Sequence, residues 1–212
     1  MNLSDLRTDY TLKSFNEKDV IQNPFDQFKL WFNDALEAKV NEPNAMTVAT
    51  IKSDGSPSAR ILLFKELENE AFVFYSNYLS NKANEISFDN RVALVFFWPE
   101  LQRQIRIEGK AEKIEAHKSD EYFLSRPRGS QIGAYASEQS KPLENSEELE
   151  QKTKHFEEVF SKIEITRPEN WGGYAVKPNS FEFWQGRANR LHDRFLFSLN
   201  SESNWIIQRL SP

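Results

Sequence analysis

The amino-acid sequence predicts a mainly β fold: an antiparallel barrel, closed or nearly closed, that carries peripheral helices. Two observations lead to this class. About nine short β-rich segments follow one another closely along the 212 residues, with turn residues between them. The helical segments are grouped instead of alternating with strands, which argues against the βαβ pattern of a parallel sheet. A chain of this length can form one domain with a sizeable core.

The first element is an amphipathic helix preceded by a polar arm. Residues 1–22 lack a clear period and are expected to be ordered only where something holds them. The single domain then spans 23–212. Asn23 and Pro24 are typical of an N-cap and a first helical residue, and the helix is expected to end near Val40. Its apolar face would contain Phe25, Phe28, Phe32, Ala35 and Leu36.

The strands are predicted from β-rich or alternating segments. The first two form a hairpin, because Ser53–Pro57 holds an Asp-Gly turn. The apolar face of the fifth strand fades toward its C-terminal end. The predicted strands are Met46–Ile51, Ala59–Lys65, Ala71–Ser76, Arg91–Trp98, Gln104–Ile114, Gly173–Val176, Phe181–Trp184, Arg194–Leu199 and Trp205–Leu210.

The remaining helices fall between these strands. A short one is expected around Asn81–Phe88, and a helical pair at Ser119–Leu124 and Gln131–Ser137. Residues 138–155 are rich in Glu, Lys, Gln and Ser, which is typical of a solvated helix face. One face of a further helix would then contain Phe156, Val159, Phe160 and Ile163.

Composition excludes several classes of function. The net charge is −5, from 27 Lys and Arg against 32 Asp and Glu, which argues against a general nucleic-acid or anionic-membrane binder. There is no cysteine, hence no disulfide or thiolate chemistry. No signal peptide or membrane span is predicted, so a cytoplasmic location is expected. No metal-ligand cluster, dinucleotide fingerprint, phosphate loop or hydrolase elbow is present, and a borrowed cofactor becomes more attractive.

Two cationic segments lie in the first half of the chain. Arg60–Lys65 is an apolar strand with a cation at each end; by itself it is better explained as a core strand than as an anion grip. Tyr75–Lys82 carries a hydroxyl-rich strand end into a helix start near Ser80. An ordinary Ser cap explains this segment, but Lys82 opposes the helix dipole there, and a ligand phosphate would remove that conflict.

Two further cationic segments follow. Tyr122–Gln131 holds two arginines, two serines and a tyrosine, and is either a charged helix junction or a second anion pocket. In Trp184–Arg194, Arg190 and His192 would share one face of an extended chain, with Asp193 and Arg194 on the other. Surface loop and active site are equally compatible with that segment alone. Together the four segments suit flavin mononucleotide (FMN) plus a phosphorylated substrate.

Several strings in the right order resemble the pyridoxamine/pyridoxine 5′-phosphate oxidase family. The resemblance runs from Leu6 to Pro212, and its most specific parts are Ser125–Ala134, Trp171–Gly173, Phe183–Gly186 and Arg190–Arg194. It implies an FMN-binding split barrel and a homodimer with two FMN sites at the subunit interface. It also implies the cofactor-binding residues Arg60, Ile61, Leu62, Leu63, Phe64, Lys65, Tyr75, Ser76, Lys82, Gln104, Gln139, Ser140, Trp184 and Arg194, with Gln139 and Ser140 reaching across the interface.

The resemblance implies a substrate site as well. The substrate phosphate would be held by Lys65, Tyr122, Arg126 and Ser130, and the pyridine ring would lie by the catalytic residues Arg190 and His192. Arg7 and Tyr10 match a mobile segment that covers the site. Where the family usually has Ser-Arg-Lys, this chain has Asn81 between Ser80 and Lys82, which predicts weaker FMN binding.

The implied reaction converts pyridoxamine or pyridoxine 5′-phosphate to pyridoxal 5′-phosphate. A hydride equivalent passes from substrate C4′ to flavin N5, and O2 is reduced to H2O2. Two other hypotheses remain: a split-barrel flavin reductase with a nicotinamide or deazaflavin donor, and a non-enzymatic module that binds FMN, pyridoxal phosphate or haem. The intact set of substrate-side residues argues against both.

Overall fold

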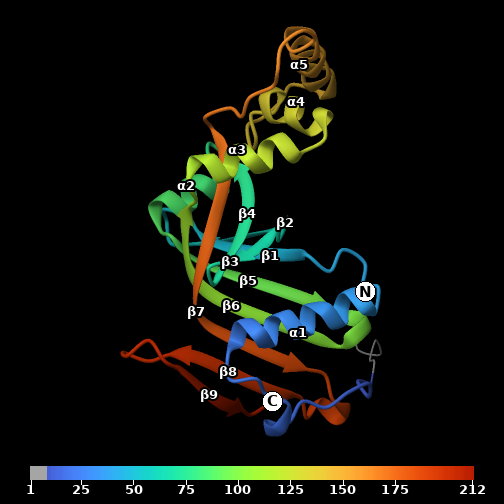
Figure 1. Cartoon of the computed structure of the whole chain (residues 1–212), viewed down its shortest axis with the longest axis vertical. Coiled ribbons are helices and arrows are strands. Elements are labelled where there is room, and N and C mark those ends of the chain that lie inside the picture. Colours follow the sequence, from blue (N-terminus) through green and yellow to red (C-terminus); the bar gives the residue numbers. More distant parts are fainter. Residues whose placement is uncertain (1–8) are drawn as a thin grey trace.

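The computed structural model of the chain describes residues 9–212, and its first long helix lies across one face of a curved sheet (Figure 1). Helix α1 (Pro24–Glu37) begins as the sequence predicts, because the Asn23 side chain accepts hydrogen bonds from the backbone N–H groups of Phe25 and Asp26. The helix ends at Glu37, slightly before the predicted end near Val40. It buries Phe25, Phe28 and Trp31 against the sheet.

Nine antiparallel strands form one sheet, in the order β2-β1-β5-β6-β7-β4-β3. Strand β8 pairs with β7, and β9 pairs with β8. No ladder joins β2 to β3 within residues 9–212, so the barrel is split, as expected. The strands are β1 (Ala45–Ile51), β2 (Pro57–Leu63), β3 (Glu66–Glu68), β4 (Ala71–Asn77), β5 (Arg91–Trp98), β6 (Arg103–Lys113), β7 (Trp171–Gln185), β8 (Asp193–Leu199) and β9 (Trp205–Leu210).

Three strand predictions were wrong in detail. The two short strands predicted at Gly173–Val176 and Phe181–Trp184 are parts of one strand, β7. Lys177, Pro178 and Asn179 interrupt the apolar pattern, but a register shift between Glu108 and Gly109 of β6 accommodates Pro178. The strand predicted at Ala59–Lys65 ends at Leu63, and β3 was not predicted at all.

The other helices follow later in the chain. Helix α2 (Asn81–Phe88) has the predicted bounds, whereas the helical pair is longer than predicted, at α3 (Ala116–Ser125) and α4 (Arg128–Ala136). Helix α5 (Ser146–Val159) begins within the polar segment and ends before Ile163, which corrects the prediction of a helix over Phe156–Ile163. Helices α3, α4 and α5 stand together beyond the β4 end of the sheet (Figure 1).

Two apolar cores result. The main core is aromatic: Phe28 packs edge-to-face on Phe72 and Phe96, with ring centroids 4.8 and 5.2 Å away. The smaller core contains Phe123, Ile132, Phe160, Ile165 and Trp171, and joins the helical group to the start of β7. No helix within residues 9–212 is long and apolar enough to cross a membrane.

The arm preceding α1 is held against the domain. Phe15 is buried and packs on Trp31 and Phe195, with ring centroids 5.0 and 4.9 Å away. A short 3-10 turn follows at Glu17–Asp19. The sequence did not predict this contact, because Phe15 is a single aromatic residue within a polar segment that shows no apolar period.

Candidate functional site

A cavity of about 560 Å³ lies where the helical group meets β4 and the start of β7. It brings together residues from three of the four cationic segments of the sequence, and none of its lining residues is acidic. The lining residues are Leu63, Lys65, Tyr75, Ser76, Asn77, Tyr122, Arg126, Pro127, Ser130, Gly133, Ala134, Ser137, Gln139 and Trp171. Six of these lining residues had no predicted site role: Asn77, Pro127, Gly133, Ala134, Ser137 and Trp171. Four of the six, Pro127, Gly133, Ala134 and Trp171, belong to strings that carried the resemblance.

Lys82 lies behind the cavity wall, and its ammonium group has only neutral partners. Its Nζ donates to Ser76 Oγ at 3.0 Å, Ser80 Oγ at 3.3 Å and Gln139 Oε1 at 3.2 Å. Burial, and then the charge of Arg60, lower the pKa of Lys82 below its usual value. The nearby charge of Glu85 offsets part of this lowering, but Lys82 forms no contact ion pair within residues 9–212. Because Gln139 accepts from Lys82 and also lines the cavity, it lies in the cavity of its own chain.

Arg60 is fixed by neighbours on its own chain. Its Nη2 lies 2.9 Å from Glu85 Oε2 and 2.6 Å from Ser58 Oγ, and its Nη1 donates to Thr50 Oγ1 at 2.5 Å. Burial opposes ionisation of Glu85, but the hydrogen bonds from Thr50 and Arg60 outweigh it, and the pKa of Glu85 is lowered. The arginine is oriented by this network before any ligand binds.

A wall of stacked rings closes one side of the cavity. Tyr75 and Tyr122 are nearly parallel, with centroids 3.8 Å apart and an interplanar angle of 15°, and Trp171 lies parallel to both. Burial, with Glu66 contributing, raises the pKa of Tyr75, so its hydroxyl stays neutral. The guanidinium of Arg126 lies 4.6 Å from the Trp171 ring.

Arg126 has an unsatisfied buried donor. Its Nη1 has no hydrogen-bond partner within residues 9–212, and burial lowers the pKa of the group. An unpaired buried N–H is costly unless a ligand satisfies it. Flat rings beside uncompensated cations suit a planar ligand that carries a phosphate.

A second group of predicted residues lies elsewhere. His192 packs on Trp184 with centroids 4.5 Å apart, and Tyr10 lies edge-on to Trp184 at 5.8 Å. Burial, followed by Arg190 and Arg194, lowers the pKa of His192. The two groups stand at opposite ends of β7, which begins at Trp171 and ends just after Trp184 (Figure 1).

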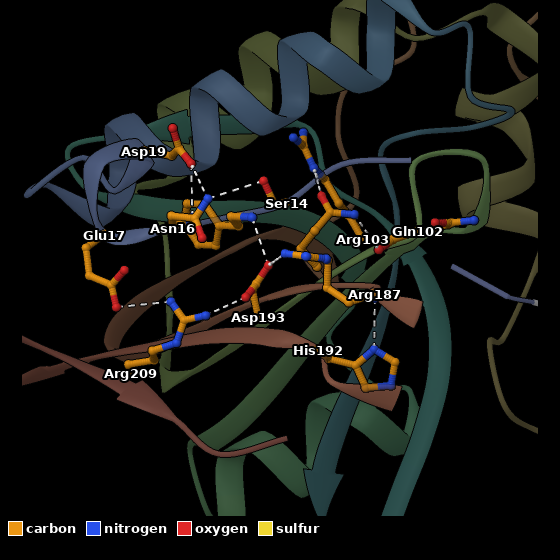
Figure 2. Close-up of polar contacts among 12 residues, drawn as sticks. Ser14, Asn16, Glu17, Asp19, Gln102, Arg103, Arg187, His192, Asp193 and Arg209 are labelled. Carbon is orange, nitrogen blue, oxygen red and sulfur yellow. Dashed lines mark hydrogen bonds and ion pairs between the residues drawn. The ribbon is translucent and has the colours of Figure 1, made fainter. Parts of the chain in front are cut away.

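The loop before β8 departs from the prediction. Arg190 and His192 do not share one face of an extended chain, because Ala188–Arg190 forms a 3-10 turn in which Arg190 has φ 61°. Asp193 and Arg194 both form ion pairs, but with different partners: Asp193 with Arg187 and Arg209, and Arg194 with Glu182. The backbone N–H of Arg187 donates to His192 Nδ1 at 3.1 Å (Figure 2).

The predicted run Arg60–Lys65 cannot present all its side chains to one ligand. Alternation along β2 leaves Ile61 and Leu63 exposed, while Leu62 packs against the core. Phe64 follows the strand and is buried in the core, so its side chain does not line the cavity. Leu63 and Lys65 do line it.

The other predicted residues are placed as follows. Gln104 on β6 is paired in register with Trp184 on β7. Ser140 is exposed, with φ 74°, just beyond Gln139. Arg7 lies outside the described residues. Gly172 and Gly173 follow Trp171, and neither position has room for a side chain. A Cβ on Gly172 would clash with the Tyr78 hydroxyl oxygen, and one on Gly173 would clash with Ile114 Cδ1 and lie 2.9 Å from Tyr75 Cε1.

The fold and cavity define a split-barrel protein with a cationic, aromatic pocket, and comparison with known families agrees. The family described as pyridoxamine 5′-phosphate oxidase matches residues 32–160, and the pyridoxine 5′-phosphate oxidase C-terminal dimerisation region matches residues 171–212. The chain belongs to the pyridoxamine 5′-phosphate oxidase family.

Relatives and solved structures match along nearly the whole chain. A pyridoxine/pyridoxamine 5′-phosphate oxidase of Trichormus variabilis is 50% identical over 210 residues, covering 99% of this chain and 98% of the relative. The Aliarcobacter butzleri protein of that name is 48% identical and covers all of both chains. The crystal structure of PhzG from Burkholderia lata, in complex with tetrahydrophenazine-1-carboxylic acid, matches with a TM-score of 0.89 and 28% sequence identity. The match covers 95% of this chain and 99% of the PhzG chain.

A more distant structure shows the fold alone. It is a pyridoxamine 5′-phosphate oxidase-related, FMN binding protein from Nostoc punctiforme, 15% identical with TM-score 0.71, covering 90% of this chain and 98% of the other.

Proposed function

We propose that this protein oxidises pyridoxamine 5′-phosphate and pyridoxine 5′-phosphate to pyridoxal 5′-phosphate in an FMN-dependent reaction that reduces O2 to H2O2. The observation that carries the proposal is the cavity in which Lys65, Arg126 and the stacked tyrosines meet without any carboxylate. Full-length relatives about half identical to this chain carry the name of this oxidase. We also propose a cytoplasmic location, which a cysteine-free chain suits.

The donor set fits FMN. The Lys82 ammonium, the hydroxyls of Ser76 and Ser80 and the oriented Arg60 guanidinium offer the charge-assisted hydrogen bonds that a phosphate monoester takes. The start of α2 lies beside them and adds the positive end of its dipole. Bound FMN would supply the redox chemistry, accepting a hydride equivalent from substrate C4′ and delivering electrons to O2.

A second phosphate, that of the substrate, would take Lys65, Tyr122, Arg126 and Ser130 as ligands. These four side chains line the same cavity, and Arg126 brings a donor that lacks a partner. The Tyr122 hydroxyl would donate to this phosphate while its ring stays stacked on Tyr75. Binding here would fix the substrate's position before chemistry.

The remaining predicted residues would complete the site across a homodimer. Trp184, Arg190, His192 and Arg194 lie at the far end of β7 from the cavity, within the region that matches the family's dimerisation segment. We propose that this end of one subunit meets the cavity of the other. Arg190 and His192 would then flank the substrate ring, and Trp184 and Arg194 the flavin.

An aerobic assay with saturating FMN and pyridoxamine 5′-phosphate tests the proposal. Pyridoxal 5′-phosphate and H2O2 should appear in equal amounts. Oxidation of NAD(P)H without these products would instead indicate a flavin reductase. Bound flavin without any turnover would indicate a binding module.

Arg126→Met provides a site-specific check of the same proposal. The variant should raise KM for pyridoxamine 5′-phosphate by about tenfold or more, because it removes a charge-assisted phosphate contact. Arg128→Met is the matched control, since Arg128 donates to the Phe160 backbone carbonyl and does not line the cavity. Equal KM values for the two variants would contradict the assignment.

A further inference from the structure

Asp193 is a buried carboxylate that joins three segments of the chain. It begins β8 and is 3% exposed. Its Oδ2 accepts from the Phe15 backbone N–H at 3.0 Å and from Arg187 Nη1 at 2.7 Å, and its Oδ1 accepts from Arg209 Nη2 at 2.5 Å (Figure 2). Burial by itself would raise the pKa of Asp193, but these donors lower it, so the group is an anion at neutral pH.

Arg187 links Asp193 to His192, because its side chain contacts one residue and its backbone the other. Its side chain is tied to Asp193, while its backbone N–H donates to His192 Nδ1 at 3.1 Å (Figure 2). The side-chain tether therefore limits the movement of the peptide group that contacts the imidazole. Nothing in the sequence pattern marked Arg187 as different from its neighbouring arginines.

The backbone contact determines the tautomer of His192. A backbone N–H can only donate, so Nδ1 must present a lone pair. In the neutral imidazole the proton then lies on Nε2. Protonating Nδ1 would break the contact, and burial with Arg190 and Arg194 already disfavours the cationic ring. Within residues 9–212, Nε2 has no hydrogen-bond partner.

The same carboxylate also orders the arm. The backbone N–H of Phe15 donates to Asp193, and Tyr10 lies five residues earlier in the arm. The centroid of the Tyr10 ring is 5.8 Å from that of Trp184 and 6.0 Å from that of His192. The charged and titratable groups around His192 thus come from the arm, the loop and β8: Tyr10, Arg187, Arg190, Asp193 and Arg194.

We propose that Asp193 is a positioning residue that acts through Arg187 to hold His192 as a neutral Nε2–H donor, aimed at an oxygen acceptor of the bound ligand. The inference rests on the proposed function only for the identity of that acceptor. The tether itself belongs to the free protein.

The test measures the His192 tautomer by NMR of protein labelled with nitrogen-15 in histidine. His117 and His155 serve as internal references, because neither has its Nδ1 on a backbone N–H within residues 9–212. Wild-type His192 should show an unprotonated Nδ1 and a protonated Nε2 throughout the neutral range. In Arg187→Gln, its nitrogen shifts should move toward those of the reference histidines.

Arg209→Gln is the matched control. It also removes one cation from Asp193, but Arg209 has no contact with His192, so the tautomer should be unchanged. Asp193→Asn should behave like Arg187→Gln. Should Asp193→Asn fail to fold, Arg187→Gln still decides the question, since the Arg187 side chain is 40% exposed.

Kinetics supplies the second readout. Arg187→Gln should lower kcat for pyridoxamine 5′-phosphate by about tenfold, because a misplaced donor loses the productive geometry. Arg187→Lys should restore part of it. A wild-type proton on Nδ1, or unchanged His192 shifts in Arg187→Gln, would overturn the proposal. If the shifts behave as expected but no protein oxidises the substrate, the tether stands and the proposed function fails.

Discussion

The Arg60 guanidinium lies 2.9 Å from the Glu85 carboxylate, and this ion pair connects β2 to α2 beside the buried Lys82. The Arg60 and Glu85 side chains are 21% and 10% exposed. Glu85 pairs with Arg60, whereas Lys82 forms no contact ion pair within residues 9–212 and has only neutral hydrogen-bond partners. The ion pair therefore fixes the orientation of the Arg60 guanidinium and leaves the Lys82 ammonium available to a ligand.

Replacing Glu85 should make stability less sensitive to acid. The pKa of Glu85 is lowered below 4.5, so on acidification the unfolded chain takes up this proton first. The stabilisation is present above about pH 4.5 and is lost as pH falls through the lowered pKa. Glu85→Gln should lower the free energy of unfolding by about 1–2 kcal/mol at pH 7. The difference in unfolding free energy between wild type and variant, measured by urea unfolding, should become smaller toward pH 3. A difference that stays constant with pH would contradict this account.

Removing the Lys82 ammonium should affect cofactor binding more than folding. Lys82→Met takes away a buried charge with only neutral partners, so the apoprotein should be as stable as wild type or more stable. The FMN dissociation constant should rise by about tenfold or more, through loss of a charge-assisted contact. Quenching of FMN fluorescence measures the change. Lys29→Met is the control, because Lys29 is an exposed partner of Asp26 on α1.

Asn81→Arg tests the departure from the family pattern. Asn81 is exposed at the first residue of α2, next to Lys82. A guanidinium there should tighten FMN binding by about tenfold, since it adds a bidentate phosphate donor. An unchanged dissociation constant in the same fluorescence titration would mean that Arg60 and Lys82 already saturate the phosphate.

Gly186→Ala should loosen the arm without unfolding the domain. A Cβ on Gly186 would lie 2.8 Å from Tyr10 Cγ, so the Tyr10 ring must move away from Trp184. The variant should be cleaved faster before Phe15 in limited proteolysis and should show a raised KM. Gly129→Ala is the control, because a Cβ on Gly129 would meet nothing within 4 Å. Equal cleavage rates would refute the contact.

The sequence predicts most of the fold because each element carries its own local signal. Asn23 and Pro24 mark the start of α1, and Asp54 with Gly55 marks the β1–β2 hairpin. The errors arise where tertiary structure overrides local pattern. Pro178 looks like the end of a strand until its partner strand shifts register, and Phe15 in a polar arm carries no period.

The candidate site is predicted less completely. The residue types of the cavity could be found, because cations beside hydroxyls and aromatics suggest phosphate binding. The distance between the cavity and the second group, Trp184, Arg190, His192 and Arg194, could not be predicted. It depends on the length of β7, which the sequence pattern divides into two strands. The sequence places Asp193 only on the opposite face of an extended segment from Arg190 and His192. Its contact with Phe15, distant by 178 positions, has no local signal.

The length of β7 has a genetic consequence. Trp171 and Trp184 lie near its two ends, roughly 40 Å apart at about 3.3 Å per residue, so one subunit cannot apply both ends to the same cofactor. Two impaired alleles, Arg126→Met and His192→Ala, should therefore complement each other if each site is shared between subunits as proposed. A mixed dimer would then carry both lesions in one site and leave the other intact, so a pyridoxal phosphate auxotroph carrying both alleles should grow faster than a strain carrying either allele alone.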